Sequence, residues 1–183
     1  MNDIKFKPVI LGIDVGAYSV ARTFYEFYNV KSIIIGKYTY WMTNYSKITE
    51  TYTVDGMKED KLIDYLVDLK KQYPDTKLLL FGCSEDYVDT IVRNKDVLDK
   101  YYVIPTVDLK TLNRVVEKEN FYDVCKKVGI NYPKTIILNK DNYKDTSIPF
   151  KYPIVGKVSN KAIYQRISFE GKMKVFIINS YEE

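Results

Sequence analysis

The first two thirds of the chain alternate short apolar runs with longer segments of helical period. The apolar runs are rich in Ile, Leu and Val and lie at residues 8–12, 31–35, 77–81 and 102–104. Between them, Ser19–Tyr28 and Glu59–Tyr73 carry apolar residues every three or four positions, which predicts helices. Thr49–Val54 alternates like an exposed strand, and Ser84 can cap a further helix. This order predicts an α/β fold with a Rossmann-like, doubly wound parallel sheet over residues 1–115.

Parallel sheets of this kind bind ligands at the carboxyl ends of their strands. The loops expected there are 12–16, 36–45 and 82–84. The first reads Gly12-Ile-Asp14-Val-Gly16, a tight turn that brings backbone amides to a small ligand, with Arg22 following. It departs from G-x-G-x-x-G, and no G-x-x-x-x-G-K-[ST] sequence is present, so both common dinucleotide and P-loop patterns are disfavoured. Gly12, Asp14, Gly16 and Arg22 are the predicted substrate-binding residues.

The pattern changes after Asp108. Two helices are predicted at 109–116 and 120–128, the second ended by Gly129. Strands predicted at 135–138, 152–158 and 174–178 lack crossover helices between them, which favours antiparallel pairing in a partial α+β unit over 116–183. Ser180-Tyr-Glu-Glu183 fits a helix-opening capping box without a helix behind it. We expect the chain to stop inside its second domain; a frayed polar tail is the alternative.

The composition narrows the chemistry. The 183 residues contain no histidine, which excludes a Ser-His-Asp triad, a Cys-His pair and any histidine-bound metal within this chain. The chain lacks a membrane-length apolar run and an N-terminal signal pattern, which predicts a cytoplasmic protein without a membrane partner. Its 18 tyrosines are spread through every segment, so no nucleic-acid partner is expected. Residues 118–183 carry 12 basic and 7 acidic side chains, a balance that suits a phosphate-rich ligand or a solvated surface.

Two lysines stand out in this basic part. Lys157 ends the apolar run Pro153-Ile-Val-Gly-Lys157, and Lys118 lies just before a predicted helix. A lysine inside a buried strand is costly unless its ammonium meets an anion, and phosphate is a natural partner. An edge-strand lysine that points to water is the alternative for Lys157, and an ordinary surface lysine is the alternative for Lys118.

Several longer motifs resemble a known family. Residues 117–130 with Tyr132-Pro-Lys-Thr135, and Phe150-Lys-Tyr-Pro-Ile-Val-Gly-Lys157, resemble the opening of an ATP-grasp domain. Within that family the chain is similar to carboxylate–amine ligases of the D-aspartate ligase type. The matching motifs are Leu11-Gly-x-Asp14, Tyr18-x-x-Ala21-Arg22, Tyr45-Ser-Lys-Ile48, Asn120-Phe-Tyr122 and Phe169-Glu-Gly-Lys172. The Rossmann-like first domain then corresponds to the family's pre-ATP-grasp domain.

The resemblance implies a function and a set of partners. Lys118 and Lys157 would contact the ATP phosphates, although Lys157 is followed by Val-Ser159-Asn160 rather than by proline and a glycine-rich loop. Ser159 and Asn160 would add hydrogen bonds there. The intact enzyme would join small carboxylate and amine substrates through an acyl phosphate, with an amino acid added to a cell-wall precursor as the implied reaction. The Mg²⁺ ligands are expected downstream of this chain, which predicts an inactive fragment. The sequence leaves open whether the protein forms a homodimer.

Two other function classes stay open from the sequence. One is carbamoyl-phosphate synthase-like ATP-grasp chemistry, because the deciding residues lie outside the chain. The other is a non-catalytic Rossmann module that binds a nucleotide or another small ligand and ends naturally at Glu183.

Overall fold

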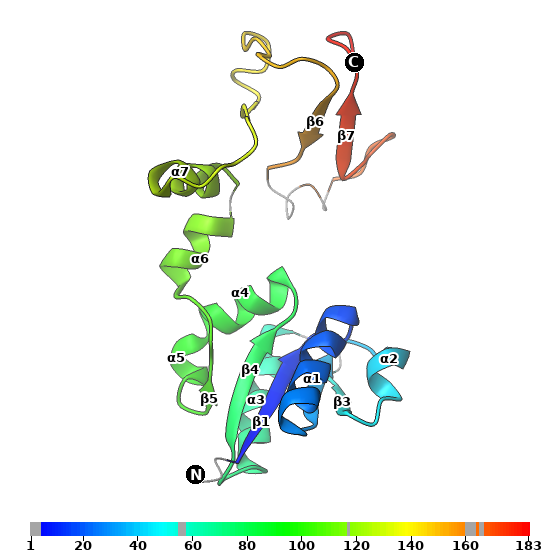
Figure 1. The fold of residues 1–183 in the computed structure, drawn as a ribbon, viewed down its shortest axis with the longest axis vertical. Helices are drawn as coiled ribbons and strands as arrows, with labels where there is room; N and C mark the ends of the chain where they lie inside the picture. The colour runs from blue at the N-terminus through cyan, green and yellow to red at the C-terminus, as the bar shows by residue number, and fades with distance from the viewer. Residues whose placement is uncertain (1–4, 55–57, 117, 160–163, 165–166) are drawn as a thin grey trace. The chain divides into compact units, whose positions relative to one another are not determined.

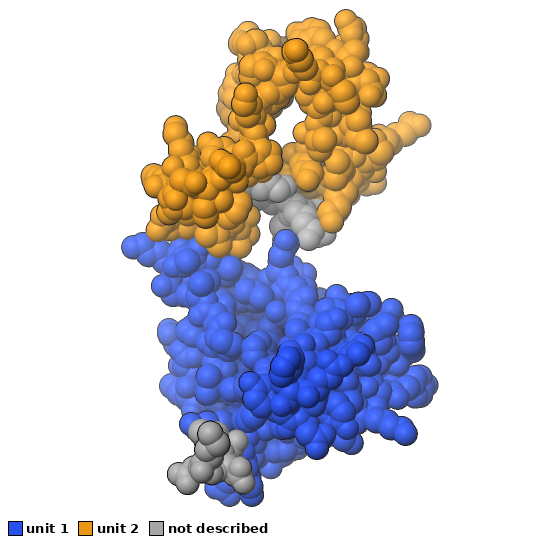
Figure 2. Space-filling model, in the orientation of Figure 1, with its two compact units in different colours: residues 1–112 blue, residues 113–183 orange. Residues whose placement is uncertain are grey.

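The computed structural model describes residues 5–54, 58–116, 118–159, 164 and 167–183. The chain divides into two compact units, residues 1–112 and 113–183 (Figure 2). The division falls within helix α6 (Leu109–Val116), whose first turn is capped by Asp108 accepting a 2.7 Å hydrogen bond from the Thr111 backbone N–H. The domain ranges 1–115 and 116–183 remain a prediction.

Unit 1 is built on a five-stranded parallel sheet, which confirms the predicted α/β doubly wound class (Figure 1). The strand order is β3-β2-β1-β4-β5. The strands are β1 (Phe6–Leu11), β2 (Ser32–Gly36), β3 (Thr49–Thr53), β4 (Lys77–Gly82) and β5 (Tyr102–Val103). Each forms from one of the apolar or alternating runs in the sequence, because β-branched and aliphatic side chains suit a pleated surface buried on both faces.

Alternate side chains of the central strands enter two separate cores. Val9, Leu11, Ile33 and Ile35 join one buried cluster, which includes residues of α3 (Glu59–Lys71), α4 (Glu85–Arg93) and α5 (Lys95–Leu98). Ile10 and Ile34 point the other way and pack with residues of α1 (Val15–Tyr28). The period-two alternation of a strand therefore places helices on both faces of the sheet. Burying each such side chain contributes about 1.5–3 kcal/mol.

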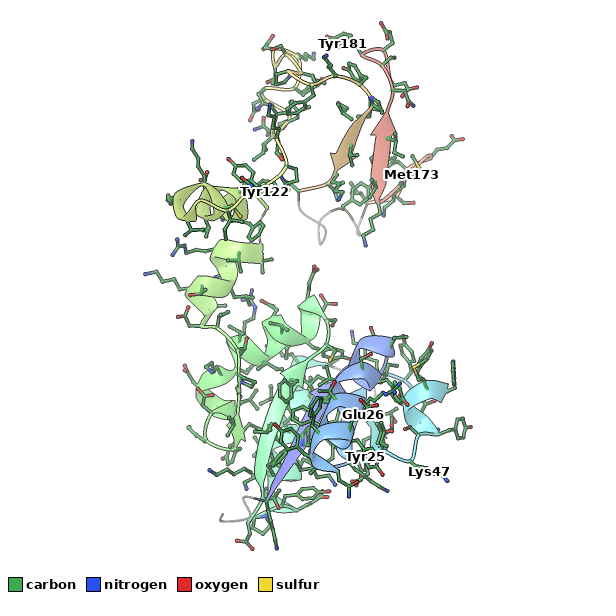
Figure 3. The ribbon with its side chains drawn as sticks, viewed as in Figure 1. Tyr25, Glu26, Lys47, Tyr122, Met173 and Tyr181 are labelled. Atoms are coloured by element: carbon green, nitrogen blue, oxygen red, sulfur yellow. The ribbon has the colours of Figure 1, made fainter. Side chains whose placement is uncertain are left out.

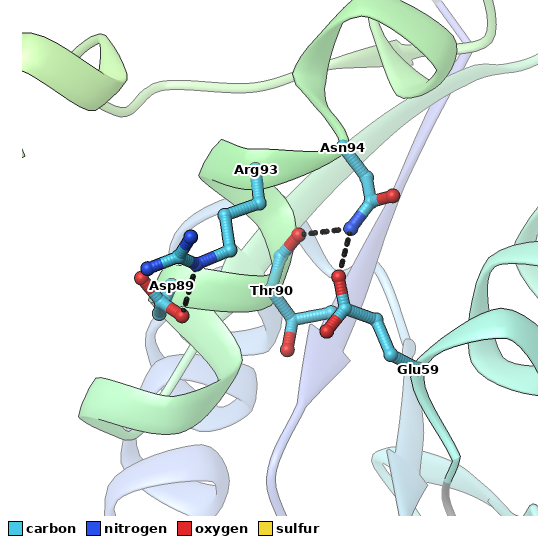
Figure 4. A network of polar contacts seen from close by, with 5 residues as sticks. All are labelled: Glu59, Asp89, Thr90, Arg93 and Asn94. Atoms are coloured by element: carbon cyan, nitrogen blue, oxygen red, sulfur yellow. Dashed lines mark hydrogen bonds and ion pairs between the residues drawn. The ribbon is translucent and has the colours of Figure 1, made fainter.

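A polar contact joins the helices on the first of these faces. The Asn94 amide donates to the Glu59 carboxylate at the start of α3 (2.6 Å) and to the Thr90 carbonyl of α4 (2.9 Å) (Figure 4). Arg93 pairs with Asp89 one turn back along α4, at 2.7 Å. Asn94 therefore fixes the end of α4 against the beginning of α3.

Two local predictions about unit 1 need adjustment. Helix α1 begins at Val15 rather than at Ser19, because the Asp14 side chain accepts a hydrogen bond from the Ala17 N–H and caps the helix earlier. The loop predicted after β2 contains a short helix, α2 (Trp41–Asn44).

Unit 2 carries α7 (Lys118–Val128) and a two-stranded sheet of β6 (Ile154–Lys157) and β7 (Val175–Ile178). These strands pair antiparallel, as the missing crossover helices predict. Helix α7 is followed by Gly129 with φ +74°, and the Ile130 N–H donates to the Cys125 carbonyl at 2.9 Å. The strand predicted at 135–138 is wrong: these residues pair with no strand among the described residues, and a strand forms only where a neighbour takes its backbone hydrogen bonds.

Candidate functional site

The candidate site lies where β1 and β4 end side by side at the centre of the sheet. The chain leaves β1 toward one edge strand and β4 toward the other, so their following loops diverge at a topological switch point. We call this region the switch-point edge: residues 12–14, residues 83–84 and the first turns of α1 and α4. The Cys83 N–H donates to the Leu11 carbonyl (2.8 Å) and the Gly12 N–H to the Ile35 carbonyl (2.9 Å), which fixes both loops to the strands.

Glycine permits the close approach of these loops. Gly12 has φ +134°, and a Cβ there would lie 3.0 Å from the Cβ of Cys83. A Cβ on Gly82 would lie 2.8 Å from the Val88 backbone nitrogen in α4. A larger residue at position 12 would push the two loops apart, and one at position 82 would push the end of β4 away from α4.

Two helices begin at the switch-point edge with a side-chain cap. Asp14 caps α1 through the Ala17 N–H at 3.1 Å, and Ser84 caps α4 through the Tyr87 N–H at 3.4 Å. Helix N-termini attract anions, but the Asp14 carboxylate already supplies a negative charge at α1. Glu85 and Asp86 add two more in the first turn of α4. This charge pattern favours a cationic group over a phosphate.

The pKa values of Cys83 and Tyr87 are both raised, mainly by burial and in part by the charge of Asp14. Burial and, to a smaller extent, the charge of Asp14 raise the pKa of the Cys83 thiol to about 11. Burial also raises the pKa of Tyr87; nearby Tyr38, Asp86 and Asp14 raise it further, whereas the backbone of Lys37 acts in the opposite direction. Tyr87 of α4 therefore lies near the loop that follows β2.

The loop after β2 flanks the switch-point edge. Its helix α2 buries Thr43, whose hydroxyl lies 3.3 Å from the Ile13 carbonyl, beside Asp14. The aromatic side chains of Tyr38, Trp41 and Tyr45 are exposed. Sequence reasoning identified this loop but missed Thr43 and Tyr87, because neither lies in a motif; only the Ser84 cap, three residues before Tyr87, pointed toward it.

The structure separates the four predicted substrate-binding residues. Gly12 and Asp14 lie together at the switch-point edge, and a Cβ on Gly16 would lie 3.2 Å from an Asp14 carboxylate oxygen. Arg22 lies two turns further along α1, exposed and paired with Glu26 at 2.6 Å (Figure 3 labels Glu26). Its role in substrate binding stays a prediction.

The predicted phosphate-binding residues belong to unit 2. Lys118 is the first residue of α7. Lys157 is the last residue of β6 and is exposed, so the interpretation as a buried strand lysine is wrong. Among the described residues β6 pairs only with β7, and its alternate residues are open to solvent. Ser159 is exposed just beyond it, and Asn160 lies outside the described residues. Exposed lysine and serine donors fit a phosphate chemically, and their phosphate contacts stay a prediction.

Unit 1 also has two hollows, of which the first adjoins the switch-point edge at Gly82 and Val88. A cavity of about 100 Å³ lies between β4, α4 and the chain after β5, and a groove of about 570 Å³ lies near the amino ends of the strands. The groove is lined by Lys5, Phe6, Lys7, Tyr28, Asn29, Val30, Lys31, Glu50, Tyr73 and Thr76. Neither hollow contains Asp14 or Cys83.

Within the part of the chain that the structure describes, no three His, Cys, Asp or Glu side chains gather in a group that could hold a metal ion. Over the same residues, every helix is too short or too polar to cross a membrane.

Comparison with solved structures supports the fold. An L-amino acid ligase from Bacillus licheniformis matches with a TM-score of 0.56 and 12% identity, covering 99% of this chain and 41% of its own. This likeness shows that the two chains share a fold. No protein-family model matches the chain.

Sequence comparison is more specific. D-aspartate ligase of Enterococcus faecium is 32% identical over 194 residues, which cover all of this chain and 46% of the relative. The chain is a homologue of D-aspartate ligase along its whole length, which confirms the predicted resemblance to ligases of this type. The chain spans about half the length of this curated relative.

Proposed function

We propose that this chain is part of an ATP-dependent ligase that joins a carboxylate to an amine. The observation that carries the proposal is the similarity to D-aspartate ligase along the whole chain. ATP would supply the phosphoryl group that activates the carboxylate, and the amine would then displace phosphate to form an amide. The substrate would be an amino acid, with D-aspartate as the first candidate and a cell-wall precursor as the partner it is joined to.

The switch-point edge would hold the amino acid by its ammonium group. The Asp14 carboxylate uses one oxygen for the Ala17 N–H, which fixes its direction, and the other oxygen can accept from an ammonium. Glu85 and Asp86 reinforce the negative potential, and an ammonium bound there would be a charge-assisted partner. Gly12 keeps the Cys83 loop close enough to form the opposite wall.

Unit 2 would contribute to phosphate binding. Lys118 and Lys157, with Ser159 and Asn160, would neutralise phosphate charge, which is the electrostatic stabilisation that phosphoryl transfer requires. Mg²⁺ would be held by carboxylates outside these 183 residues. The described part of unit 2 has a small core, in which Cys125 is the one buried apolar side chain. Val155 and Ile177 on the β6–β7 sheet are exposed.

Amino-acid binding can be tested on the chain itself. Because Cys125 is buried, a thiol reagent at pH 8.5 should modify Cys83 first. The modification rate therefore reports on the surroundings of the Cys83 thiol, whose pKa depends on burial and partly on the charge of Asp14. D-aspartate should slow the modification of Cys83 in a saturable way. Asp14→Asn keeps the helix cap but removes the charge, so it should abolish the protection while leaving the thermal unfolding midpoint nearly unchanged.

Asp68→Asn is the matched control for that experiment. Asp68 is an exposed acid on α3 that pairs with Lys71, so its neutralisation should leave protection intact. Equal protection in the wild type and in Asp14→Asn would contradict the ammonium site.

ATP binding tests the phosphate assignment. We expect weak binding, measured by titration calorimetry, and a further loss in the Lys118→Ala/Lys157→Ala double variant. The Lys126→Ala/Lys127→Ala variant, in the last turn of α7, removes the same charge at other positions and is the control. Nanomolar ATP binding that survives the Lys118/Lys157 change would overturn the assignment.

A further inference from the structure

We propose that Thr43 is a positioning residue that sets the direction of the Asp14 carboxylate at the switch-point edge. The proposal deepens the function proposed above and rests on it for the identity of the bound group. Thr43 has no exposed surface and lies on α2, in the loop after β2, 30 positions away from Ile13 in the sequence. A fully buried hydroxyl must find a hydrogen-bond acceptor, and its choice of acceptor connects two loops.

The hydroxyl of Thr43 has two carbonyl oxygens within reach. The Ile13 oxygen lies at 3.3 Å and the Tyr40 oxygen at 3.2 Å. The Tyr40 carbonyl already accepts from the backbone N–H groups of Thr43 and Asn44. Since a hydroxyl donates a single proton, the Ile13 carbonyl is the acceptor whose satisfaction depends on Thr43.

Thr43 is itself held from the opposite side. Its backbone carbonyl accepts hydrogen bonds from the hydroxyls of Thr49 and Thr51, the second at 3.0 Å. Both donors lie on β3, which is fixed in the parallel sheet by β2. A chain of hydrogen bonds therefore runs from a sheet strand through α2 to the Ile13 carbonyl.

The Ile13 carbonyl controls the orientation of the next residue. It belongs to the same planar peptide group as the Asp14 nitrogen, so fixing the carbonyl fixes the plane from which Asp14 starts. The Ile13 side chain is buried against Gly36, which prevents the turn from sliding. The backbone carbonyl of Asp14 also accepts from the Tyr18 N–H at 3.0 Å, and its carboxylate accepts from the Ala17 N–H at 3.1 Å. The carboxylate is therefore aimed by its own hydrogen bond and by the peptide plane that the Ile13 carbonyl fixes.

Two variants separate the hydroxyl from the size of the side chain. Thr43→Val keeps the volume and removes the donor, whereas Thr43→Ser keeps the donor and removes a methyl group. We expect D-aspartate to protect Cys83 in Thr43→Val with about tenfold weaker affinity than in the wild type, and in Thr43→Ser within about twofold of it. Thr23→Val, which removes an exposed hydroxyl on α1 that bonds Ser19, should change nothing.

A second readout does not need a ligand. The Ala17 amide donates a hydrogen bond to the Asp14 carboxylate. Its hydrogen exchange should be about tenfold faster in Thr43→Val and unchanged in Thr43→Ser. Leu69→Ala is a core change on α3 that lowers global stability without touching the turn. It should leave the Ala17 exchange rate unchanged relative to the rates of the other amides of unit 1.

The two proposals fail separately. Absence of any D-aspartate protection in the wild type would refute the proposed ammonium site. Unchanged Ala17 exchange in Thr43→Val, or equal loss of protection in Thr43→Ser and Thr43→Val, would refute the positioning role of the Thr43 hydroxyl.

Discussion

The side chain of Ile13 occupies the space that a side chain on Gly36 would need. A Cβ on Gly36 would lie 1.9 Å from Cγ2 of Ile13, far inside van der Waals contact. Gly36 ends β2 and Ile13 follows β1, so the missing side chain lets the two central strands continue into loops that pack on each other. The position of Asp14, the next residue after Ile13, depends on this fit.

Gly36→Ala is therefore expected to destabilise unit 1. Overpacking of a well-filled core costs typically about 1–3 kcal/mol, and the contacting atom belongs to a buried β-branched side chain with little freedom to move. The free energy of unfolding from urea denaturation measures the change. Ile13→Ala removes Cγ2, the atom that a Cβ at position 36 would meet. The double variant should therefore lose less free energy of unfolding than the sum of the two single variants. Strict additivity would contradict the contact.

Removal of the Tyr102 hydroxyl should cost about 1 kcal/mol. The phenol is buried and donates to the Leu66 carbonyl in the middle of α3, and burial raises its pKa. Tyr102→Phe keeps the ring and leaves that carbonyl without this donor. Urea unfolding of Tyr101→Phe, the exposed neighbour, is the control and should match the wild type within error.

The thiol of Cys83 should make stability fall at alkaline pH. Its pKa in the folded chain is about 11, above the ordinary value of 9.0. Between these values the unfolded chain loses the thiol proton while the folded chain keeps it, so folding is progressively disfavoured as pH rises. The stability difference between the wild type and Cys83→Ala should therefore shrink from pH 9 toward pH 11. A difference that stays constant over this range would show that the thiol is not desolvated.

Limited proteolysis should cleave unit 2 before unit 1. The buried hydrophobic residues lie almost entirely in residues 1–112, and the turn near Lys140 and Lys144 is exposed. Trypsin at low concentration should therefore leave a resistant product close to unit 1, identified by intact mass. First cleavage inside α3 or β4 would contradict this order of stability.

The hydrophobic pattern predicted the parallel sheet because each central strand is a continuous aliphatic run. The runs at 31–35 and 77–81 became β2 and β4 with shifts of at most one residue at each end. The predicted strand at 135–138 had the same appearance and failed, because pairing depends on a neighbour that a local pattern does not contain.

Some features of the candidate site could be predicted from the sequence, and others could not. The sequence by itself determined the fold class, the glycine turn with Asp14 and the resemblance to carboxylate–amine ligases, because these depend on residue types at short spacing. Only the tertiary structure decided that Thr43 bonds Ile13, that Cys83 lies against Gly12 and that Arg22 lies two turns away from Asp14. These relationships join segments far apart in the chain or depend on helix phase, and the packing of strands and loops alone brings such atoms together.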